Sequence, residues 1–156
     1  PLVPASSIDQ VAGLLIEHAD AAMATLCTRI TRAEDYRSPH VVKVVSDAAG
    51  RALYFSRAPI PAAGHTGAAP AIGDGGFPVS ARHIGLYAYR IGALRALAVS
   101  PPCYLEQCEN LEQLRAMWMG LEIRVAQAIE PHGPDIDTPE DLQRALEFMR
   151  ATGMSA

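Results

Sequence analysis

The sequence predicts an α/β fold in which helices pack on a mixed β-sheet. Short β-branched segments alternate with segments of helical period at both ends of the chain, and a hairpin pattern lies between them. With 156 residues, of which 49% are hydrophobic, the chain is long enough to bury one core. The net charge of −4 argues against a nucleic-acid partner, and the lack of an eighteen-residue apolar run argues against a membrane span. Three cysteines without a Cys-x-x-Cys pair fit reduced thiols, so we expect a cytoplasmic protein.

The first part of the chain combines one helix with three strands. The helical segment places apolar residues at the i, i+3, i+4 and i+7 spacing, and Ser6 or Ser7 can cap its start. The strand segments are apolar and partly β-branched. A polar connection after the first of them has room for one helical turn, and the turn Asp47–Gly50 joins the other two into an antiparallel hairpin. In chain order these elements are a helix at 5–19, a strand at 22–30, the connection at 31–40, and strands at 41–46 and 52–57.

The second part opens with a segment rich in Ala, Gly and Pro, residues 62–81, which we expect to be a long flexible loop within the single domain 1–156. A strand and a short helix follow, and Pro101 and Pro102 separate them from the next helix. That helix is expected to bury a stripe of Leu111, Leu114 and Trp118 and to end at Gly120, and the last helix to turn Leu142, Ala145, Leu146 and Met149 inward. The expected elements are a strand at 83–90, helices at 91–99 and 103–119, a strand at 122–128, and a helix at 138–150.

Asp137 is a candidate metal ligand. Thr138 suits the cap of the last helix and Pro139 its first position, so helix initiation accounts for the residues that follow Asp137 but not for Asp137 itself. It comes after a strand and directly before a helix, where ligands gather in open α/β sheets. A carboxylate there could hold Mg²⁺, which takes one or two carboxylates together with substrate phosphates.

Other polar side chains have both a binding and a purely structural interpretation. Strand alternation places His83, Tyr87 and Tyr89 on one face, which could line a pocket or be a half-exposed surface. Arg57 ends a strand where a guanidinium could hold a carboxylate or phosphate, or could simply be solvated. The group Glu109, Glu112 and Gln113 lies opposite the apolar stripe of its helix, where polar residues are normally solvated.

Taken together, the segments resemble the 3-deoxy-D-manno-octulosonate (Kdo) cytidylyltransferases, or CMP-Kdo synthetases, over essentially the whole chain. The motifs occur in the order and at nearly the spacing of that family, although each alone is weak. They are Met23-Ala-Thr-Leu, Val42-Lys-Val-Val, Ala52-Leu-Tyr-Phe-Ser-Arg-Ala-Pro-Ile-Pro, Arg82-His-Ile-Gly-Leu-Tyr-Ala-Tyr-Arg, Leu111-Glu-Gln-Leu-Arg and Asp137-Thr-Pro-Glu-Asp-Leu.

The resemblance implies a nucleotide-diphospho-sugar transferase-like sandwich with a mixed sheet. It implies that CTP and Kdo react to give CMP-Kdo and pyrophosphate with the help of Mg²⁺, for lipopolysaccharide biosynthesis. It assigns Asp137 to the metal as the catalytic residue. It also implies a homodimer, with the hairpin region 41–61 near the interface. The residues that it places in the sugar-acid pocket are Arg57, His83, Tyr87, Glu112 and Gln113.

Two departures from the family pattern matter. Pro1-Leu-Val-Pro looks like the residues directly after the family's other metal aspartate, so we expect the N-terminal nucleotide-binding part to be missing and this portion to be inactive alone. After Ile60-Pro61 the chain has Ala62-Ala-Gly instead of the family's aromatic residue, Asp and Arg, which puts contacts from that loop in doubt. The alternatives are a cytidylyltransferase for another sugar acid, such as an acylneuraminate, and a non-catalytic sugar-binding or dimerisation module.

Overall fold

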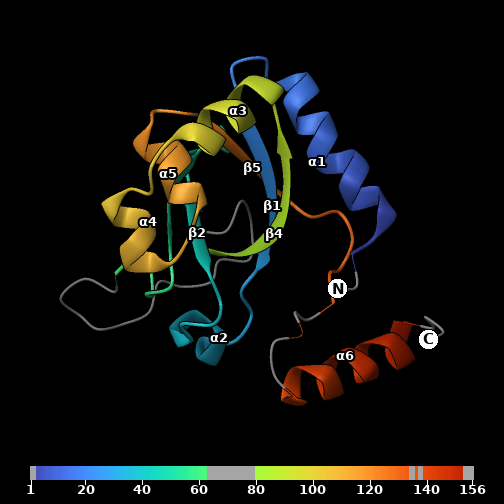
Figure 1. Ribbon diagram of the computed structural model, residues 1–156. Coiled ribbons are helices and arrows are strands. Elements are labelled where there is room, and N and C mark those ends of the chain that lie inside the picture. Colours follow the sequence, from blue (N-terminus) through green and yellow to red (C-terminus); the bar gives the residue numbers. More distant parts are fainter. Residues whose placement is uncertain (1–2, 63–79, 134–135, 137–138, 153–156) are drawn as a thin grey trace.

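Helices cover both faces of one five-stranded sheet in the computed structural model (Figure 1), which describes residues 3–62, 80–133, 136 and 139–152. The helices are α1 (Ala5–Glu17), α2 (Ala33–Arg37), α3 (Ile91–Val99), α4 (Tyr104–Glu109), α5 (Gln113–Trp118) and α6 (Pro139–Thr152). The strands are β1 (Met23–Arg29), β2 (Lys43–Ser46), β3 (Ala52–Ser56), β4 (Ala81–Tyr89) and β5 (Ile123–Gln127). The α/β prediction is confirmed. Of the expected loop 62–81, residues 63–79 lie outside the described residues, and Ala81 already belongs to β4.

The sheet is mixed, as the sequence predicted, with the strand order β3-β2-β4-β1-β5. The pair β1–β5 is parallel, and the pairs β1–β4, β2–β4 and β2–β3 are antiparallel. Only β2 and β3 are joined by a short turn, so the central pairings connect distant parts of the chain. The candidate site therefore depends on long-range contacts.

Alternation along β1 separates two apolar layers. Met23 and Cys27 are fully buried in the cluster that contains Phe55, on the face covered by α3, α4 and α5. Ala24 and Leu26 are fully buried in the other cluster, against α1 (Figure 1). A strand buried on both faces reads as a nearly continuous apolar run, which is the pattern that predicted β1.

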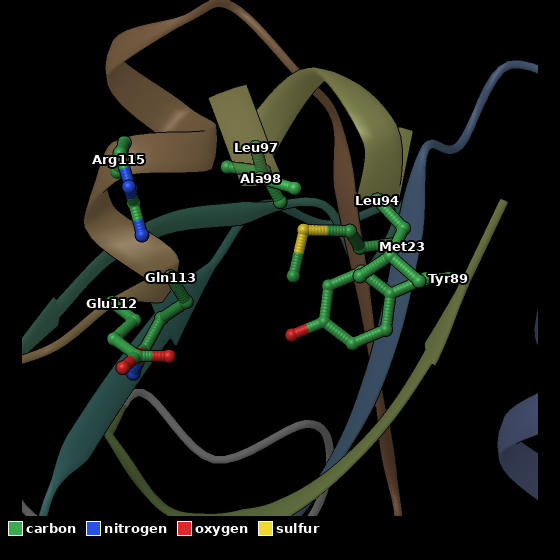
Figure 2. Close-up of a pocket in the computed structure, with 8 residues that line it drawn as sticks. All are labelled: Met23, Tyr89, Leu94, Leu97, Ala98, Glu112, Gln113 and Arg115. Carbon is green, nitrogen blue, oxygen red and sulfur yellow. The ribbon is translucent and has the colours of Figure 1, made fainter. Parts of the chain in front are cut away.

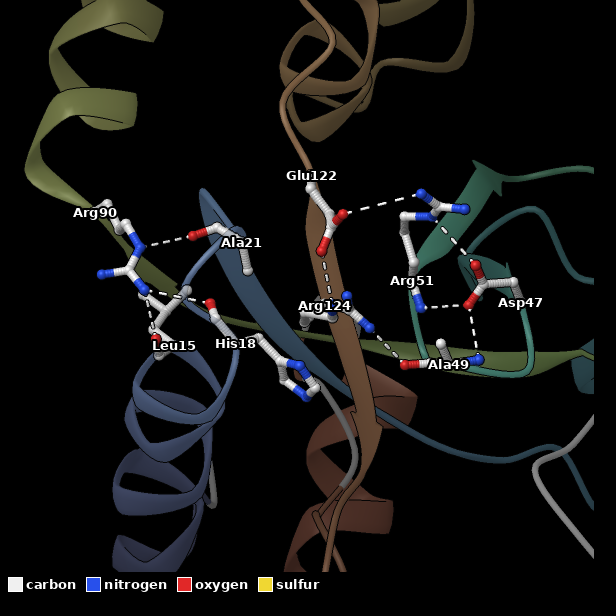
Figure 3. A network of polar contacts seen from close by, with 9 residues as sticks. All are labelled: Leu15, His18, Ala21, Asp47, Ala49, Arg51, Arg90, Glu122 and Arg124. Atoms are coloured by element: carbon white, nitrogen blue, oxygen red, sulfur yellow. Dashed lines mark hydrogen bonds and ion pairs between the residues drawn. The ribbon is translucent and has the colours of Figure 1, made fainter.

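The turn between β2 and β3 packs against β5 at one end of the sheet (Figure 3). The Val125 amide donates to the Gly50 carbonyl at 2.8 Å. The Arg124 guanidinium donates to the Ala49 carbonyl at 2.7 Å. Glu122 holds that guanidinium through a 2.7 Å ion pair with Nε. These contacts link β5, which is at the far edge of the strand order, to the hairpin.

Arg90 links the end of β4 to the end of α1 (Figure 3). Its guanidinium donates to the carbonyls of Leu15, His18 and Ala21, at 2.6, 3.2 and 2.7 Å. Two of these carbonyls lie at the C-terminal end of α1, where helix carbonyls lack partners within the helix and attract cations. Arg90 therefore fixes α1 against the sheet.

The single helix predicted over 103–119 is wrong, because the chain forms two short helices instead. Asn110 adopts the left-handed conformation with φ 53°, which ends α4, and α5 begins at a new angle. As a result Gln113, predicted on a solvated face, is buried, and Trp118, predicted in the core, is 65% exposed. Gly120 follows α5 with φ 76°, as expected of the residue after a helix.

The last helix has the predicted position but only part of the predicted buried face. Ala145 is buried, whereas Leu142 is 47% exposed. Figure 1 shows α6 standing apart from the sheet, which explains why an apolar side chain of this helix stays in contact with solvent. In the part of the chain that the structure describes, no helix is long and apolar enough to cross a membrane.

Candidate functional site

A row of aromatic rings runs along the face of the sheet under α3 and α5. His83, Tyr87 and Tyr89 of β4 share this face, as strand alternation predicted. Their ring centroids follow one another at 5.2 and 5.7 Å, and Phe55 of β3 extends the row, 5.1 Å from His83. The row therefore connects two of the predicted site residues directly.

The closeness of His83 and Tyr87 comes from a bulge in β4. Cα atoms four residues apart in a regular strand are about 13 Å apart, at roughly 3.3 Å per residue. In this sheet Thr25 of β1 pairs with Tyr87, but the next residue of β1 pairs with Ile84, so β4 contains two extra residues at this point. The bulge shortens the strand and lets the two rings meet. Sequence alternation alone gave no sign of it.

Tyr89 leads from this row into a pocket of about 180 Å³ between β4 and helices α3 and α5. Figure 2 shows the Tyr89 hydroxyl pointing towards Glu112 and Gln113, with the Met23 side chain beside the ring. Glu112 precedes α5 and Gln113 begins it, so the start of this helix supplies the polar wall. The residues that line the pocket are Met23, Tyr89, Leu94, Leu97, Ala98, Glu112, Gln113 and Arg115.

Two buried polar atoms near this pocket have no partner among the described residues: the Tyr87 hydroxyl and Gln113 Nε2. Burial raises the pKa of Tyr87 far above its usual value, and the neighbouring Tyr89 and Glu112 raise it further. The pKa of Tyr89 is raised by burial and then by Glu112. Both tyrosines are therefore neutral hydroxyls beside a carboxylate. Buried polar groups normally have partners, so this arrangement indicates a hydroxyl- or carboxylate-bearing ligand.

Arg57 lies in a different polar cluster. Its Nε donates to the Glu109 carbonyl at 2.8 Å, and its terminal nitrogens donate to the carbonyls of Pro39 and Asn110 at 3.0 and 3.4 Å. Three of the five guanidinium N–H groups are thus used: two hold the end of α4 against the end of β3, and one bonds to the segment before β2. Arg57 does not line the pocket, and its assignment to the substrate stays a prediction.

Lys43 and Glu109 belong to the same cluster, although the sequence pattern indicated only a strand for Lys43 and a solvated helix face for Glu109. The Lys43 side chain is fully buried, and its Nζ donates to the carbonyls of Ser38, Val41 and Arg57. Burial lowers the pKa of Lys43, and Glu109 opposes that shift. The Glu109 carboxylate in turn accepts from Ser56 Oγ at 2.6 Å and from the Arg57 amide at 2.9 Å. The cluster fixes the frame around the pocket rather than lining it.

The sequence also missed the apolar wall of the pocket and Arg115. Leu94, Leu97 and Ala98 come from α3, a short helix in which no residue suggested binding. Arg115 pairs with Glu106 at 3.1 Å and donates to the Ser100 carbonyl at 2.8 Å. Nothing in the local sequence identifies these residues, because their place depends on how α3 and α5 pack over β4.

Asp137, the predicted metal ligand, lies outside the described residues. Within the described ranges, no group of three or more His, Cys, Asp or Glu side chains could hold a metal ion. The assignment of Asp137 and Mg²⁺ therefore stays a prediction.

Comparison with known proteins identifies the family. The family model described as "Cytidylyltransferase" matches residues 1–123. The chain belongs to this family. Its relatives include the 3-deoxy-manno-octulosonate cytidylyltransferases of Thioalkalivibrio sulfidiphilus, 48% identical over 97% of this chain, and of Alkalilimnicola ehrlichii, 48% identical over all of it. Each match spans 60% of the relative. The resemblance seen in the sequence motifs is confirmed.

Solved structures agree with this assignment and with the predicted fold type. A structure of CMP:2-keto-3-deoxy-manno-octonic acid synthetase complexed with CTP is 34% identical, with a TM-score of 0.78. The match covers 96% of this chain and 58% of that one. This cytidylyltransferase chain thus spans about three fifths of the length of the relatives that it matches.

Proposed function

We propose that these 156 residues form part of a CMP-Kdo synthetase, an enzyme that transfers the cytidylyl group of CTP to Kdo and releases pyrophosphate, for lipopolysaccharide biosynthesis. The names of the relatives and the CTP in the similar structure support the two substrates. The observation that carries the proposal is the pocket lined by Glu112 and Gln113, with the Tyr87 hydroxyl nearby. The Tyr87 hydroxyl and Gln113 Nε2 are buried without a partner among the described residues.

The pocket residues suit a sugar acid that carries many hydroxyl groups. The Gln113 amide and the Tyr87 hydroxyl can donate to its oxygens, and Glu112 can accept from its hydroxyls. Arg57 has two N–H groups left for a carboxylate. In the reaction a sugar hydroxyl bonds to the α-phosphorus of CTP, the bond from that phosphorus to the β-phosphate oxygen breaks, and the hydroxyl loses its proton. The contribution of this chain is to bind and orient the sugar acid, which is a large part of catalysis in phosphoryl-type transfer.

Mg²⁺ and Asp137 belong to the proposal as well. When bound, Mg²⁺ would neutralise charge on the phosphates, and Asp137 supplies a carboxylate of the kind that it prefers. In a chimera that joins this chain to the uncovered part of the Thioalkalivibrio sulfidiphilus relative, we expect Asp137→Asn to abolish pyrophosphate release while the protein stays folded by circular dichroism. Near-normal turnover of this variant would remove Asp137 from the mechanism.

A homodimer in the cytoplasm completes the proposal, with the hairpin region 41–61 near the interface. The hairpin strand β3 is at one edge of the sheet, and Leu53 on it is 55% exposed. Sedimentation of the chain should show a dimer, and Leu53→Glu should shift it towards monomer. A wild-type monomer would contradict this part of the proposal without affecting the reaction.

The decisive experiment adds to this chain the part of a relative that lies outside the match. The part of the Thioalkalivibrio sulfidiphilus relative that the match does not cover is joined to these 156 residues, and pyrophosphate release from CTP is measured. We expect release that depends on Kdo from the chimera, and none from the 156-residue chain alone.

Three outcomes would contradict the proposal in different ways. Preference of the chimera for an acylneuraminate would favour a cytidylyltransferase for that sugar acid. Binding of Kdo without turnover in a folded chimera would favour a sugar-binding module. Release of pyrophosphate by the 156-residue chain alone would refute its expected inactivity.

A further inference from the structure

The bulge in β4 leaves Gly85 and Leu86 outside the register with β1, between the paired residues Ile84 and Tyr87. The carbonyls of Ile84 and Leu86 both accept from Thr25 Oγ1, at 3.0 and 2.8 Å. Thr25 is fully buried at the centre of β1, so its hydroxyl gives both carbonyls of the bulge a partner away from water.

The same hydroxyl contacts His83. Thr25 Oγ1 lies 3.0 Å from His83 Nε2. A hydroxyl has one hydrogen, and the two carbonyls can only accept, so that hydrogen is directed to them. The remaining contact then requires His83 to donate from Nε2 to a lone pair of Oγ1. Thr25 therefore selects the ring nitrogen of His83 that carries a proton.

Glycine is not what makes the bulge possible. Gly85 does not have a positive φ, and a Cβ built on it would meet nothing within 4 Å. An alanine would fit there without strain. The feature that distinguishes this position in the structure is the Thr25 hydroxyl, which bonds to both sides of the bulge and to the ring beyond it.

We propose that Thr25 is a positioning residue for the sugar-acid site. Its hydroxyl holds the β4 bulge closed, which brings His83 and Tyr87 together, and it fixes the proton of His83 on Nε2. Thr25 does not line the pocket and acts only through these neighbours. The expected effect of Thr25 on sugar-acid kinetics rests on the proposed function, whereas its expected effect on the β4 bulge and on the His83 proton does not.

The structural consequence is tested on the 156-residue chain without any substrate. Long-range ¹H–¹⁵N spectra of ¹⁵N-histidine-labelled protein report which ring nitrogen is protonated. They are recorded near pH 8, about one to two units above the usual histidine pKa, where a neutral ring has a proton on only one nitrogen. His83→Gln identifies the His83 signals. We expect Nε2–H in the wild type and in Thr25→Ser, and a changed pattern in Thr25→Val. A wild-type His83 protonated only on Nδ1 would overturn the proposal, whether or not Thr25→Val folds.

The kinetic consequence is tested in the chimera described above. Thr25→Val should raise the KM for Kdo about tenfold while the KM for CTP stays unchanged, because only the sugar-acid face is displaced. Thr25→Ser should restore the wild-type KM, and Thr28→Val, the same change on the same strand, should leave both constants unaltered. Equal defects in the serine and valine variants, or equal changes in both KM values, would refute a positioning role. If the wild-type chimera were inactive while His83 showed the expected Nε2 proton, the proposed function would fail and the role of Thr25 in the bulge would stand.

Discussion

Removal of the Tyr87 hydroxyl should stabilise the ligand-free chain. This hydroxyl is buried without a partner among the described residues. An unpaired buried polar group costs about 1–3 kcal/mol, whereas the phenyl ring of Tyr87→Phe keeps the apolar contacts of the original side chain. We therefore expect Tyr87→Phe to raise the free energy of unfolding by about 1 kcal/mol.

Tyr36 provides a matched control of opposite sign. Its side chain is also buried, but its hydroxyl donates to the Pro61 carbonyl at 2.5 Å. Tyr36→Phe removes the same atom and breaks a hydrogen bond, so it should lower the free energy of unfolding by about 1 kcal/mol. The two variants differ only in whether the chain itself satisfies the hydroxyl.

The assay is urea unfolding followed by circular dichroism, in which an unchanged m-value shows that the shift of midpoint is a change of stability. Repeated with saturating Kdo, it should show a larger stabilisation of wild type than of Tyr87→Phe, because the ligand supplies the missing partner. If Tyr87→Phe destabilises the ligand-free chain as much as Tyr36→Phe does, the Tyr87 hydroxyl has a partner in the chain. The Tyr87 hydroxyl would then give no indication of a ligand.

Three further changes test the frame around the site by the same unfolding assay. Burial raises the pKa of the Cys27 thiol from 9.0 to about 12. The stability that the buried neutral thiol contributes is fully present below pH 9.0 and is lost as the pH rises towards 12, so the free energy of unfolding of wild type should fall by about 2 kcal/mol more than that of Cys27→Ala between about pH 8 and about pH 10.5. Equal decreases in the two proteins would contradict the burial of this thiol. Gly50→Ala should cost about 1–2 kcal/mol, because φ is 77° and the new Cβ would lie 3.0 Å from the Val125 carbonyl oxygen, whereas Gly85→Ala should change stability by less than about 0.5 kcal/mol. Lys43→Met should cost about 3 kcal/mol or more, since three partly buried carbonyls lose their donor, and a neutral result would show that they find other partners.

The strands could be predicted because burial on one or both faces leaves a periodic record in the sequence. The first strand is predicted by its nearly continuous apolar run, and the common face of His83, Tyr87 and Tyr89 by alternation. The β4 bulge could not be found in this way. It adds an even number of residues, so the alternation of faces on either side is unchanged, and the side chain that stabilises it, Thr25, lies about sixty residues earlier in the chain.

The division of the predicted helix 103–119 was hidden for a different reason. An apolar stripe at helical spacing runs across the junction, and Asn110 is an ordinary helix residue unless tertiary contacts favour its left-handed conformation. Contacts made by Glu109 with the end of β3 supply such a constraint. The change of direction is what buries Gln113, so the error in the helix and the misplaced polar face have one cause.

Residue type alone does not separate the groups that hold this fold from those that remain available to a ligand. Arg57 and Lys43 have the charges that sequence reasoning associates with anion binding, yet most of their donors are bonded to backbone carbonyls of the chain. Tyr87 and Gln113 are uncharged, but each brings to the pocket region a buried polar atom that has no partner in the part of the chain that the structure describes. A donor contributes most to the free energy of binding when it breaks no hydrogen bond within the protein in order to reach the ligand. Tyr87 and Gln113 should therefore dominate the affinity for the sugar acid, and Arg57 should affect it chiefly by holding α4 in position. Tyr87→Phe should therefore weaken binding of Kdo although it stabilises the ligand-free chain, and Gln113→Leu should weaken binding more than it weakens the fold. The reverse order is expected for Arg57→Leu.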